Sequence, residues 1–426
     1  MQRHIEVIPE IDVPGHARAA IKAMDARAAS LTAAGKPEEA AKFRLSDPED
    51  MSTYRSVQMW RDNVVNPCQE STYAFLGVVI DDIVSMYTEA GAPLSTLHTG
   101  GDEVPRHVWE KSKACEAVVG KVPGVASTAD LPRYFLGRLN ALVAAHKLVT
   151  GGWEEIGLTK VDDKKVVDPT FLDKNLLTYV WNNVWGWGDE DVGYKLANAG
   201  YKVVLANATN LYFDLAYEKD PEEPGYYWAS ITETRKPFEF VPENLFESAY
   251  QDQMGNPIDQ VATYANRVHL DAKGLGNILG LQGELWSENI RSPETLEYLA
   301  FPRVLALAER AWSPAPDWAS QPDQAARVKL IDVAWNQFAN SLGQVQLPRL
   351  DYLFGGVGYR LSPPGAVIEG GELKANTAYP GLTIRYTTDG SEPTAASPVY
   401  TAPVAVSSVV KLKTFDSRGR GSRTVA

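Results

Sequence analysis

Apolar runs that alternate with helical patterns constrain the fold of this chain more than any other sequence feature. Strands are expected at residues 5–11, 97–103, 148–151, 177–181, 201–207 and 278–281. Helices are expected at residues 17–44, 71–90, 132–146, 192–199 and 295–312. Strands that alternate with helices favour an α/β protein with a parallel sheet.

Polar and aromatic residues gather just after these strands rather than before them. This placement is typical of a (β/α)8 barrel, whose active site lies at the carboxyl ends of its strands. The chain offers about six such strands and opens on one of them, whereas a closed barrel needs eight. We therefore predict a TIM-type barrel that lacks its first βα units. The other interpretation is that two strands escape detection, because boundaries taken from one sequence are imprecise.

The sequence pattern changes near residue 358, where short alternating runs are separated by Gly, Pro and Ser. Runs at residues 382–386 and 409–413 predict strands, and Asp389-Gly390 is a strong signal for a tight hairpin. We predict a catalytic barrel at residues 1–355, followed by a small all-β, immunoglobulin-like sandwich at residues 356–426.

Composition argues against several classes of function. The formal net charge is −13 and no basic patch offers a surface for nucleic acid. No apolar run approaches the roughly 18 residues of a membrane span, and the first residues carry no signal-peptide pattern. Cys68 and Cys115 lack the spacing of a zinc site. Two buried thiols and one disulfide remain equally open interpretations of this pair.

Two adjacent carboxylates, Asp102 and Glu103, follow two glycines at the end of a predicted strand. Repulsion and partial burial at a barrel mouth would raise the pKa of at least one of them, which suits a general acid. Glu103 is the candidate to protonate a glycosidic oxygen, and Asp102 the candidate to orient a substrate group. A solvated acidic turn is the simpler interpretation of this pair taken alone.

Aromatic residues recur after successive strands, and the chain has 11 Trp and 19 Tyr, enough to build a sugar-stacking wall. The residues concerned are Trp153, Trp181, Tyr212 and Trp286, with Asp214 and Glu288 two positions after the last two. On an extended segment, a spacing of two puts both side chains on one face. A single Trp is usually a core residue, but the repetition predicts an aromatic-walled pocket with polar contacts.

His16 and His98, with Asp12, Asp102 and Glu103, form a second hypothesis, a metal site of histidines and carboxylates. No HxH or HExxH spacing occurs, and the chain has six histidines. Hydrogen-bonded histidines are therefore the favoured interpretation. We predict neither a metal nor a cofactor.

Several motifs occur in a fixed order along the chain. They are residues 8–16 (IPEIDVPGH), 98–103 (HTGGDE), 152–156 (GWEEI), the Tyr212/Asp214 pair and residues 285–288 (LWSE). Together they resemble glycoside hydrolase family 20. Residues 303–312 are similar to the last barrel helix of that family, and residues 225–228 and 386–393 look like those of bacterial chitobiases.

The resemblance implies a retaining exo-β-N-acetylhexosaminidase in which the 2-acetamido oxygen of the substrate attacks the anomeric carbon. Glu103 is then the general acid/base, Asp102 holds the acetamido N–H, and Tyr212 donates to the acetamido oxygen. The implied substrate-binding residues are His16, His98, Trp153, Trp181, Asp214, Trp228, Trp286 and Glu288. Chitobiose, chitooligosaccharides or N-acetylhexosamine-terminated glycans are the implied substrates, in the periplasm or outside the cell.

One element of the family finds no match in this sequence. The first barrel strand of the family supplies an arginine for the terminal sugar, and full chitobiases also carry N-terminal domains. We therefore expect a chain truncated at its N-terminus, with the missing part of the same enzyme as a partner. The alternatives are a sugar-binding fragment without turnover, and the metal-dependent hydrolase.

Overall fold

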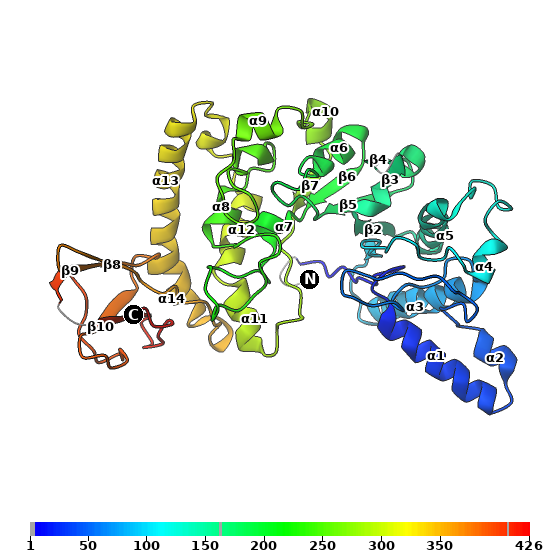
Figure 1. Cartoon of the computed structure of the whole chain (residues 1–426), viewed down its shortest axis with the longest axis horizontal. Coiled ribbons are helices and arrows are strands. Elements are labelled where there is room, and N and C mark those ends of the chain that lie inside the picture. Colours follow the sequence, from blue (N-terminus) through cyan, green and yellow to red (C-terminus); the bar gives the residue numbers. More distant parts are fainter. Residues whose placement is uncertain (1–4, 162–163, 407–408) are drawn as a thin grey trace. The chain divides into compact units, whose positions relative to one another are not determined.

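The computed structural model describes residues 5–161, 164–406 and 409–426 (Figure 1). The chain forms two compact units. Unit 1 comprises Met1–Asn182, Asp191–Leu205 and Val268–Gly280, and unit 2 comprises Asn183–Glu190, Ala206–Arg267 and Leu281–Ala426. None of the described helices combines the length and the apolar character needed to cross a membrane.

Unit 1 is built on a sheet with the strand order β1-β2-β5-β6-β7. Its strands are β1 (Thr96–His98), β2 (Val149–Trp153), β5 (Leu176–Val180), β6 (Lys202–Leu205) and β7 (Ile278–Leu281). The first four are parallel, and their register places His98 beside Gly151 and Trp153 beside Tyr179. The order rises along the chain as in a βα barrel, and the described residues supply five of the eight strands of a closed one. Residues that follow these strands therefore lie at one edge of the sheet.

Unit 1 contains seven α-helices among the described residues, and three of them share a core with the sheet. The seven helices are α1 (Arg18–Ala33), α2 (Pro37–Ala41), α3 (Glu70–Glu89), α4 (Lys113–Glu116), α5 (Leu131–Ala145), α6 (Val192–Ala199) and α10 (Ala272–Leu275). Ile21, Leu76, Leu97 and Phe135 join α1, α3, β1 and α5 in one core cluster. Each such side chain contributes roughly 1.5–3 kcal/mol by leaving water. A hairpin of β3 (Leu158–Val161) and β4 (Lys164–Val167) stands apart from the main sheet.

The predicted strand at residues 5–11 is wrong, because only Glu10 forms a β-bridge, with His98. Pro9 has no N–H with which to extend a ladder. Two predicted helices are also interrupted. Residues 17–44 form α1 and α2, separated at Gly35 with φ +74°, and residues 295–312 form two helices separated at Pro302. Glycine and proline are poor interior helix residues, which accounts for both breaks.

Unit 2 contains seven α-helices among the described residues. They are α7 (Ala208–Leu211), α8 (Arg235–Glu239), α9 (Gln260–Tyr264), α11 (Pro293–Ala300), α12 (Arg303–Trp312), α13 (Gln324–Ser341) and α14 (Leu347–Leu350). Short 3₁₀ segments occur in both units, at Thr128–Asp130, Glu154–Gly157, Pro169–Phe171, Leu245–Glu247, Asp317–Ser320 and Leu353–Gly355, and Leu342–Gln346 is a π-helix.

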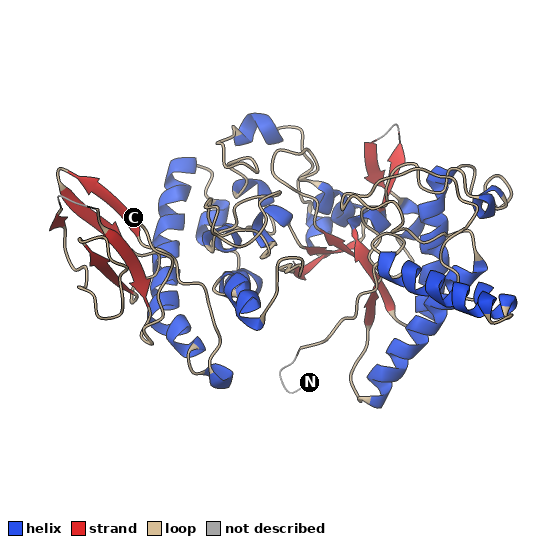
Figure 2. Cartoon of the chain, turned by 60° about the horizontal axis from the view of Figure 1, so that its bottom comes forward, coloured by secondary structure: helices blue, strands red, loops and turns tan. Residues whose placement is uncertain are grey.

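The C-terminal part is all-β, as predicted (Figure 2). Its strands are β8 (Gly365–Glu369), β9 (Glu372–Asn376), β10 (Thr383–Thr387), β11 (Val404–Ala405) and β12 (Lys411–Phe415). They form two antiparallel sheets, β11-β9-β8 and β10-β12, around Leu373, Ile384, Val410 and Leu412. The turn at Asp389-Gly390 does not close a tight hairpin: β10 pairs with β12, and the chain returns antiparallel beside β10 only at residues 398–400, where Val399 bridges Arg385. Pro393 follows the turn and cannot donate to a ladder there.

Cys68 and Cys115 form a disulfide. Cys115 is buried in a core cluster with Val108, Trp109 and Leu131. The bond closes a loop that contains α3, β1 and the Asp102-Glu103 pair. The structure thus decides between the two interpretations that the sequence leaves open.

Candidate active site

The glycines that follow β1 bring two distant segments together. Gly100 and Gly101 have φ +69° and +106°, and a Cβ on Gly100 would clash with Asp12. Only glycine allows this approach without strain. The Gly101 N–H donates to Asp12 Oδ1 at 3.2 Å. Asp12 therefore lies against the loop that carries Asp102 and Glu103.

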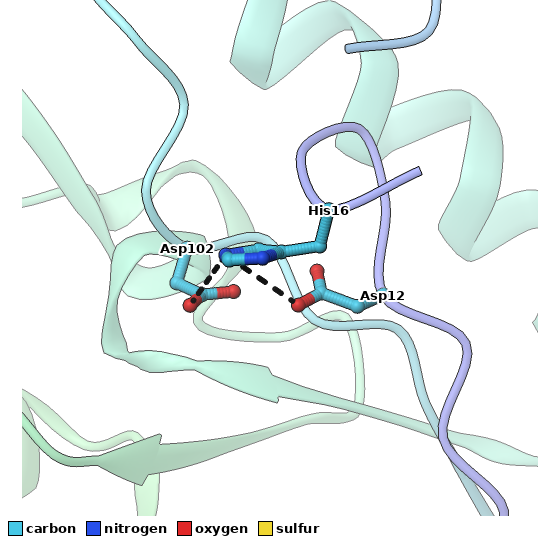
Figure 3. A group of neighbouring side chains, drawn as sticks. All are labelled: Asp12, His16 and Asp102. Carbon is cyan, nitrogen blue, oxygen red and sulfur yellow. Dashed lines mark ion pairs between the residues drawn. The ribbon is translucent and has the colours of Figure 1, made fainter. Parts of the chain in front are cut away.

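His16 lies between the carboxylates of Asp12 and Asp102 (Figure 3). Its Nε2 is 3.2 Å from Glu103 Oε2, 3.4 Å from Asp102 Oδ2 and 4.0 Å from Asp12 Oδ2. Gln58 Nε2 also donates to Glu103 Oε2, at 2.6 Å. Side-chain exposure of the imidazole and the three carboxylates runs from 14% to 28%, so a ligand can reach them from solvent.

The cluster holds protons more tightly than isolated groups do. Burial raises the pKa of Asp12 to about 9, and the nearby Asp102 charge adds to the effect. Hydrogen bonds to Asp102 and then to Glu103 raise the pKa of His16 to about 11. At neutral pH, Asp12 is therefore neutral and His16 is a cation beside Asp102 and Glu103.

His16 and Glu103 both have φ +49°, in the left-handed region. This conformation costs roughly 1–2 kcal/mol for a residue with a side chain. Such strain persists only where surrounding contacts impose it, and it concentrates at functional sites. The left-handed backbone therefore brings the side chains of His16 and Glu103 together, and this conformation lowers local stability.

His98 belongs to a separate, more deeply buried group. Its Nδ1 is 3.0 Å from Glu10 Oε1, and Trp153 Nε1 donates to the same oxygen at 3.2 Å. The His98 ring packs edge-on against Trp153 and Tyr179, at 4.9 and 4.7 Å between centroids. Trp153 is 1% exposed, so its contact with a bound sugar stays a prediction. The contacts with Trp153 and Tyr179 fix the orientation of the His98 ring.

The alternative hypothesis of a metal site with two histidines is not supported by the geometry. Potential ligand atoms of Asp12, His16 and Asp102 lie within 4.8 Å of one another. In the part of the chain that the structure describes, no such group unites His16 with His98. His98 is held by Glu10 instead.

Trp181 is positioned by a carboxylate that sequence reasoning did not assign. Glu154 Oε2 accepts hydrogen bonds from the Trp181 N–H at 2.9 Å and the Asn182 N–H at 3.4 Å. Burial raises the pKa of Glu154 to about 7. Glu10 and Glu154 lie in the family motifs, and Tyr179 lies two residues before Trp181. Their position in the sequence beside the predicted site residues could have indicated that they belong to the site. Gln58 had no comparable sequence signal.

Unit 2 brings together a second group of predicted residues. The Tyr212 ring lies 5.7 Å from Trp228 and 6.3 Å from Trp286, both at steep angles. Trp187 lies 6.2 Å from Trp228 and was not predicted, although it stands two residues after Trp185 in a cluster of Trp. Trp187 and Trp228 are 51% and 39% exposed, so their faces are open to a ligand.

Trp228 is held by an unusual turn before it. Gly225 has φ +124°, and a Cβ there would lie 2.5 Å from Ala216 N. The Tyr226 N–H donates to the Asp214 carbonyl at 2.9 Å, and the Ala216 N–H donates to the Tyr226 carbonyl at 2.7 Å. The segment before Trp228 is therefore hydrogen-bonded to the segment that carries Asp214.

Asp214 is a buried carboxyl group available to a ligand. Burial raises its pKa to about 7, and the charge of Glu288 contributes. Within the described residues its Oδ1 has no hydrogen-bond partner, which is uncommon for a buried oxygen. Asp214 and Glu288 therefore lie close enough to interact electrostatically.

The spacing argument for these pairs was wrong. Phe213 and Asp214 lie in a turn, and so do residues 287–289, so neither pair sits on an extended segment. The turns follow from backbone bonds such as the Ile290 N–H to the Ser287 carbonyl at 3.1 Å. Alternation of side chains holds only along a strand.

The parallel α/β sheet, with carboxylates and aromatic residues after its strands, defines a catalytic domain of the glycoside hydrolase class. The family model of the glycosyl hydrolase family 20 catalytic domain matches residues 1–315. A model of the chitobiase/β-hexosaminidase C-terminal domain matches residues 346–424. The chain belongs to glycoside hydrolase family 20.

Several of the proteins related to this chain come from bacteria. A β-hexosaminidase of Vibrio vulnificus is 37% identical over 91% of this chain and 46% of its own length. An N,N′-diacetylchitobiase of Vibrio harveyi is 36% identical, with the same coverages. The crystal structure of an exo-β-N-acetylglucosaminidase of Vibrio harveyi with N-acetylglucosamine matches with TM-score 0.55 and 31% identity, over 78% of this chain and 43% of that one. The chain spans about half the length of the curated relatives it matches.

Proposed function

We propose that this chain carries the active site of a retaining exo-β-N-acetylhexosaminidase. The observation that carries the proposal is the contact of His16 with Asp102 and Glu103 at the end of β1. Family membership supports the assignment of Glu103 as general acid/base. A carboxyl group that is partly open to solvent, with an imidazolium beside it, can exchange a proton with a bound ligand.

The reaction needs no protein nucleophile. Glu103 gives its proton to the glycosidic oxygen while the acetamido oxygen of the substrate attacks the anomeric carbon. Asp102 accepts the acetamido N–H and stabilises the positive oxazolinium-like intermediate. Glu103 then takes a proton from a water molecule that attacks the anomeric carbon. The bond from that carbon to the acetamido oxygen breaks, which opens the oxazolinium ring and retains the configuration. The nucleophile is tethered to the substrate, so the protein contributes orientation and charge stabilisation.

The aromatic group of unit 2 has its own proposed roles. Tyr212 donates to the acetamido oxygen, Trp286 encloses the sugar, and Trp228 stacks on the following sugar. Asp214 and Glu288 bind sugar hydroxyls. The buried oxygen of Asp214, which has no hydrogen-bond partner among the described residues, and the exposed face of Trp228 support these roles. The proposed contacts of His16, His98, Trp153 and Trp181 are to the terminal sugar and its N-acetyl group.

The proposed substrates end in N-acetylglucosamine and include chitobiose and chitooligosaccharides. The name of the Vibrio harveyi chitobiase and the N-acetylglucosamine complex of the Vibrio harveyi enzyme support this choice. We also propose a periplasmic or extracellular location and a role in chitin degradation. The Cys68–Cys115 disulfide supports the location, since such bonds persist in oxidising compartments.

The first test is hydrolysis of an aryl N-acetyl-β-glucosaminide by the purified chain and by Glu103→Gln. The variant keeps the size of the side chain but has no acid proton. Its kcat should fall by about 10²–10⁴-fold, the usual contribution of a general acid. A folded wild-type chain that binds N-acetylglucosamine without hydrolysing the aryl substrate would instead support the sugar-binding alternative.

The substrate-assisted step has a separate test. The matched aryl β-glucoside differs only in a hydroxyl where the acetamido group stands. It should react at least about 10³-fold more slowly, because the internal nucleophile and its proximity are lost. Comparable kcat/KM for the two substrates would contradict attack by the acetamido oxygen.

A further inference from the structure

A cavity of about 780 Å³ lies in unit 1 on one side of Glu103. Its wall comes from two segments, residues 52–57 with Arg61, and residues 103–107. Glu103 is part of this wall, whereas Asp102 and His16 are not. A ligand in the cavity would therefore touch the proposed general acid without lining up against Asp102 or His16.

The charge of this cavity is opposite to that of the whole chain. Arg55, Arg61 and Arg106 line it, and Glu103 is the single carboxylate among its lining residues. Within the described ranges none of the three guanidinium groups forms an ion pair. By contrast, the net charge of the chain is −13. Three guanidinium groups without ion-pair partners make this cavity a positively charged site that attracts anionic ligands.

Acidic side chains near the cavity are already engaged. Asp62 lies 2.7 Å from both Arg18 Nε and Lys22 Nζ. Glu110 Oε1 lies 3.0 Å from His107 Nδ1. Asp50 and Asp62 act electrostatically on Tyr54 in the cavity wall. In the part of the chain that the structure describes, however, no carboxylate forms an ion pair with the three arginines.

We propose that this cavity binds an anionic group, a carboxylate or a sulfate ester, on the leaving-group side of the substrate, so that substrates with such a group are favoured over neutral ones. The inference rests on the proposed function, because a general acid touches the oxygen that joins the two sugars. Asp102 is assigned to the N-acetyl sugar, so a cavity lined by Glu103 but not by Asp102 fits the leaving group. Arginine binds carboxylate and sulfate through paired hydrogen bonds, and Arg55, Arg61 and Arg106 supply that chemistry.

The test compares matched disaccharides. N-acetylglucosamine β-linked to glucuronate is set against the same sugar linked to glucose, and a second pair compares galactose 6-sulfate with galactose. The kcat/KM ratio of anionic to neutral substrate should be about 10 or more at low salt, and should approach 1 in 0.5 M NaCl as charges are screened. A ratio near 1 at low salt in both pairs overturns the proposal. A preference in one pair only identifies that anion as the ligand.

Variants locate the effect. Arg61→Gln should lower the ratio several-fold. Arg27→Gln makes the same charge change on α1, outside the cavity, where the guanidinium donates to the Glu39 carbonyl at 2.8 Å. It should keep the wild-type ratio. Equal falls in both variants would mean that net charge, not this cavity, sets the preference.

A binding measurement separates this inference from the proposed function. Glucuronate and glucose are titrated into the intact chain and followed by ligand-observed NMR. Glucuronate should bind, glucose should bind at least several-fold more weakly, and Arg61→Gln should weaken glucuronate alone. This outcome without aryl-substrate hydrolysis would leave the anion site standing while the proposed function fails. Hydrolysis of the aryl substrate without selective binding of glucuronate or sulfate would support the proposed function and overturn the anion site.

Discussion

The protonation states of Asp12 and His16 determine the charge next to Glu103. Both groups bind a proton more tightly in the folded protein than in the unfolded chain. Their pKa values rise on folding from 3.8 to about 9 and from 6.5 to about 11. A group whose pKa is raised by folding stabilises the folded state fully at low pH and loses that effect as pH rises through the folded value. The window is about pH 4–9 for Asp12 and about pH 6.5–11 for His16.

Asp12→Asn should therefore weaken the pH dependence of stability. Asn mimics the protonated carboxyl group and keeps an acceptor for the Gly101 N–H. Between pH 5 and 9 the free energy of unfolding should fall less in the variant than in the wild type, by more than about 1 kcal/mol. Urea unfolding at pH 5, 7 and 9 measures the difference. The exposed control Asp173→Asn should follow the wild type, and parallel curves for Asp12→Asn would contradict the prediction.

At the scale of elements, the apolar pattern of the sequence predicted the helices and strands whose bounds depend on nearby residues. The helix at Val192–Ala199 and the strand at Ile278–Leu281 have the predicted bounds, because each is a continuous apolar pattern. The helix breaks at Gly35 and Pro302 were visible in the sequence but were not used. The turn at residues 213–214 is bonded to distant segments, since the Phe213 N–H donates to the Glu284 carbonyl, so no local pattern reveals it. The turn at residues 287–289 is closed by the local bond from the Ile290 N–H to the Ser287 carbonyl, which the apolar alternation does not reveal.

The candidate site divides in the same way. Asp102 and Glu103 could be proposed because two glycines and a strand end precede them. His16 and Glu103 were grouped only in the metal hypothesis, and their direct contact could not be predicted because it depends on left-handed backbone at both residues. The burial of Trp153 also depends on packing against His98, which lies on another strand. Sequence patterns name residue types, whereas tertiary contacts decide which of them meet.

Arg303 is the residue through which α12 holds unit 2 together. It is fully buried and donates to the carbonyls of Leu299, Leu215 and Thr232 at 2.6–3.0 Å, and it stacks 3.7 Å from the Tyr217 ring. These carbonyls belong to segments that follow Tyr212 and Asp214. The guanidinium therefore fixes the backbone on which the aromatic group stands.

Arg303→Met should lower the free energy of unfolding by at least about 3 kcal/mol. The substitution leaves several buried carbonyls without donors, and each unsatisfied group costs about 1–3 kcal/mol. Chemical denaturation of the variant, beside Arg349→Gln at an exposed site, measures the effect. A loss below about 1 kcal/mol would show that these carbonyls find other donors.

At the scale of the whole molecule, one covalent bond ties together segments 47 residues apart. Closing a loop of this length restricts the unfolded chain and stabilises the folded one by about 4 kcal/mol in the entropic account. Cys68→Ala/Cys115→Ala should lower the free energy of unfolding by roughly 2–4 kcal/mol. Reductant should destabilise the wild type and leave the double variant unaffected. If reductant leaves the wild type unchanged as well, the bond contributes no stability.

The same bond changes what a protease can separate. Arg106 is exposed and lies between Cys68 and Cys115, so trypsin can cut the loop beside the Asp102-Glu103 pair. Both products would stay covalently joined and would migrate as one band until reductant is added. A single band on a non-reducing gel is therefore no proof of an unbroken backbone, and lost activity in such a sample can come from one nick.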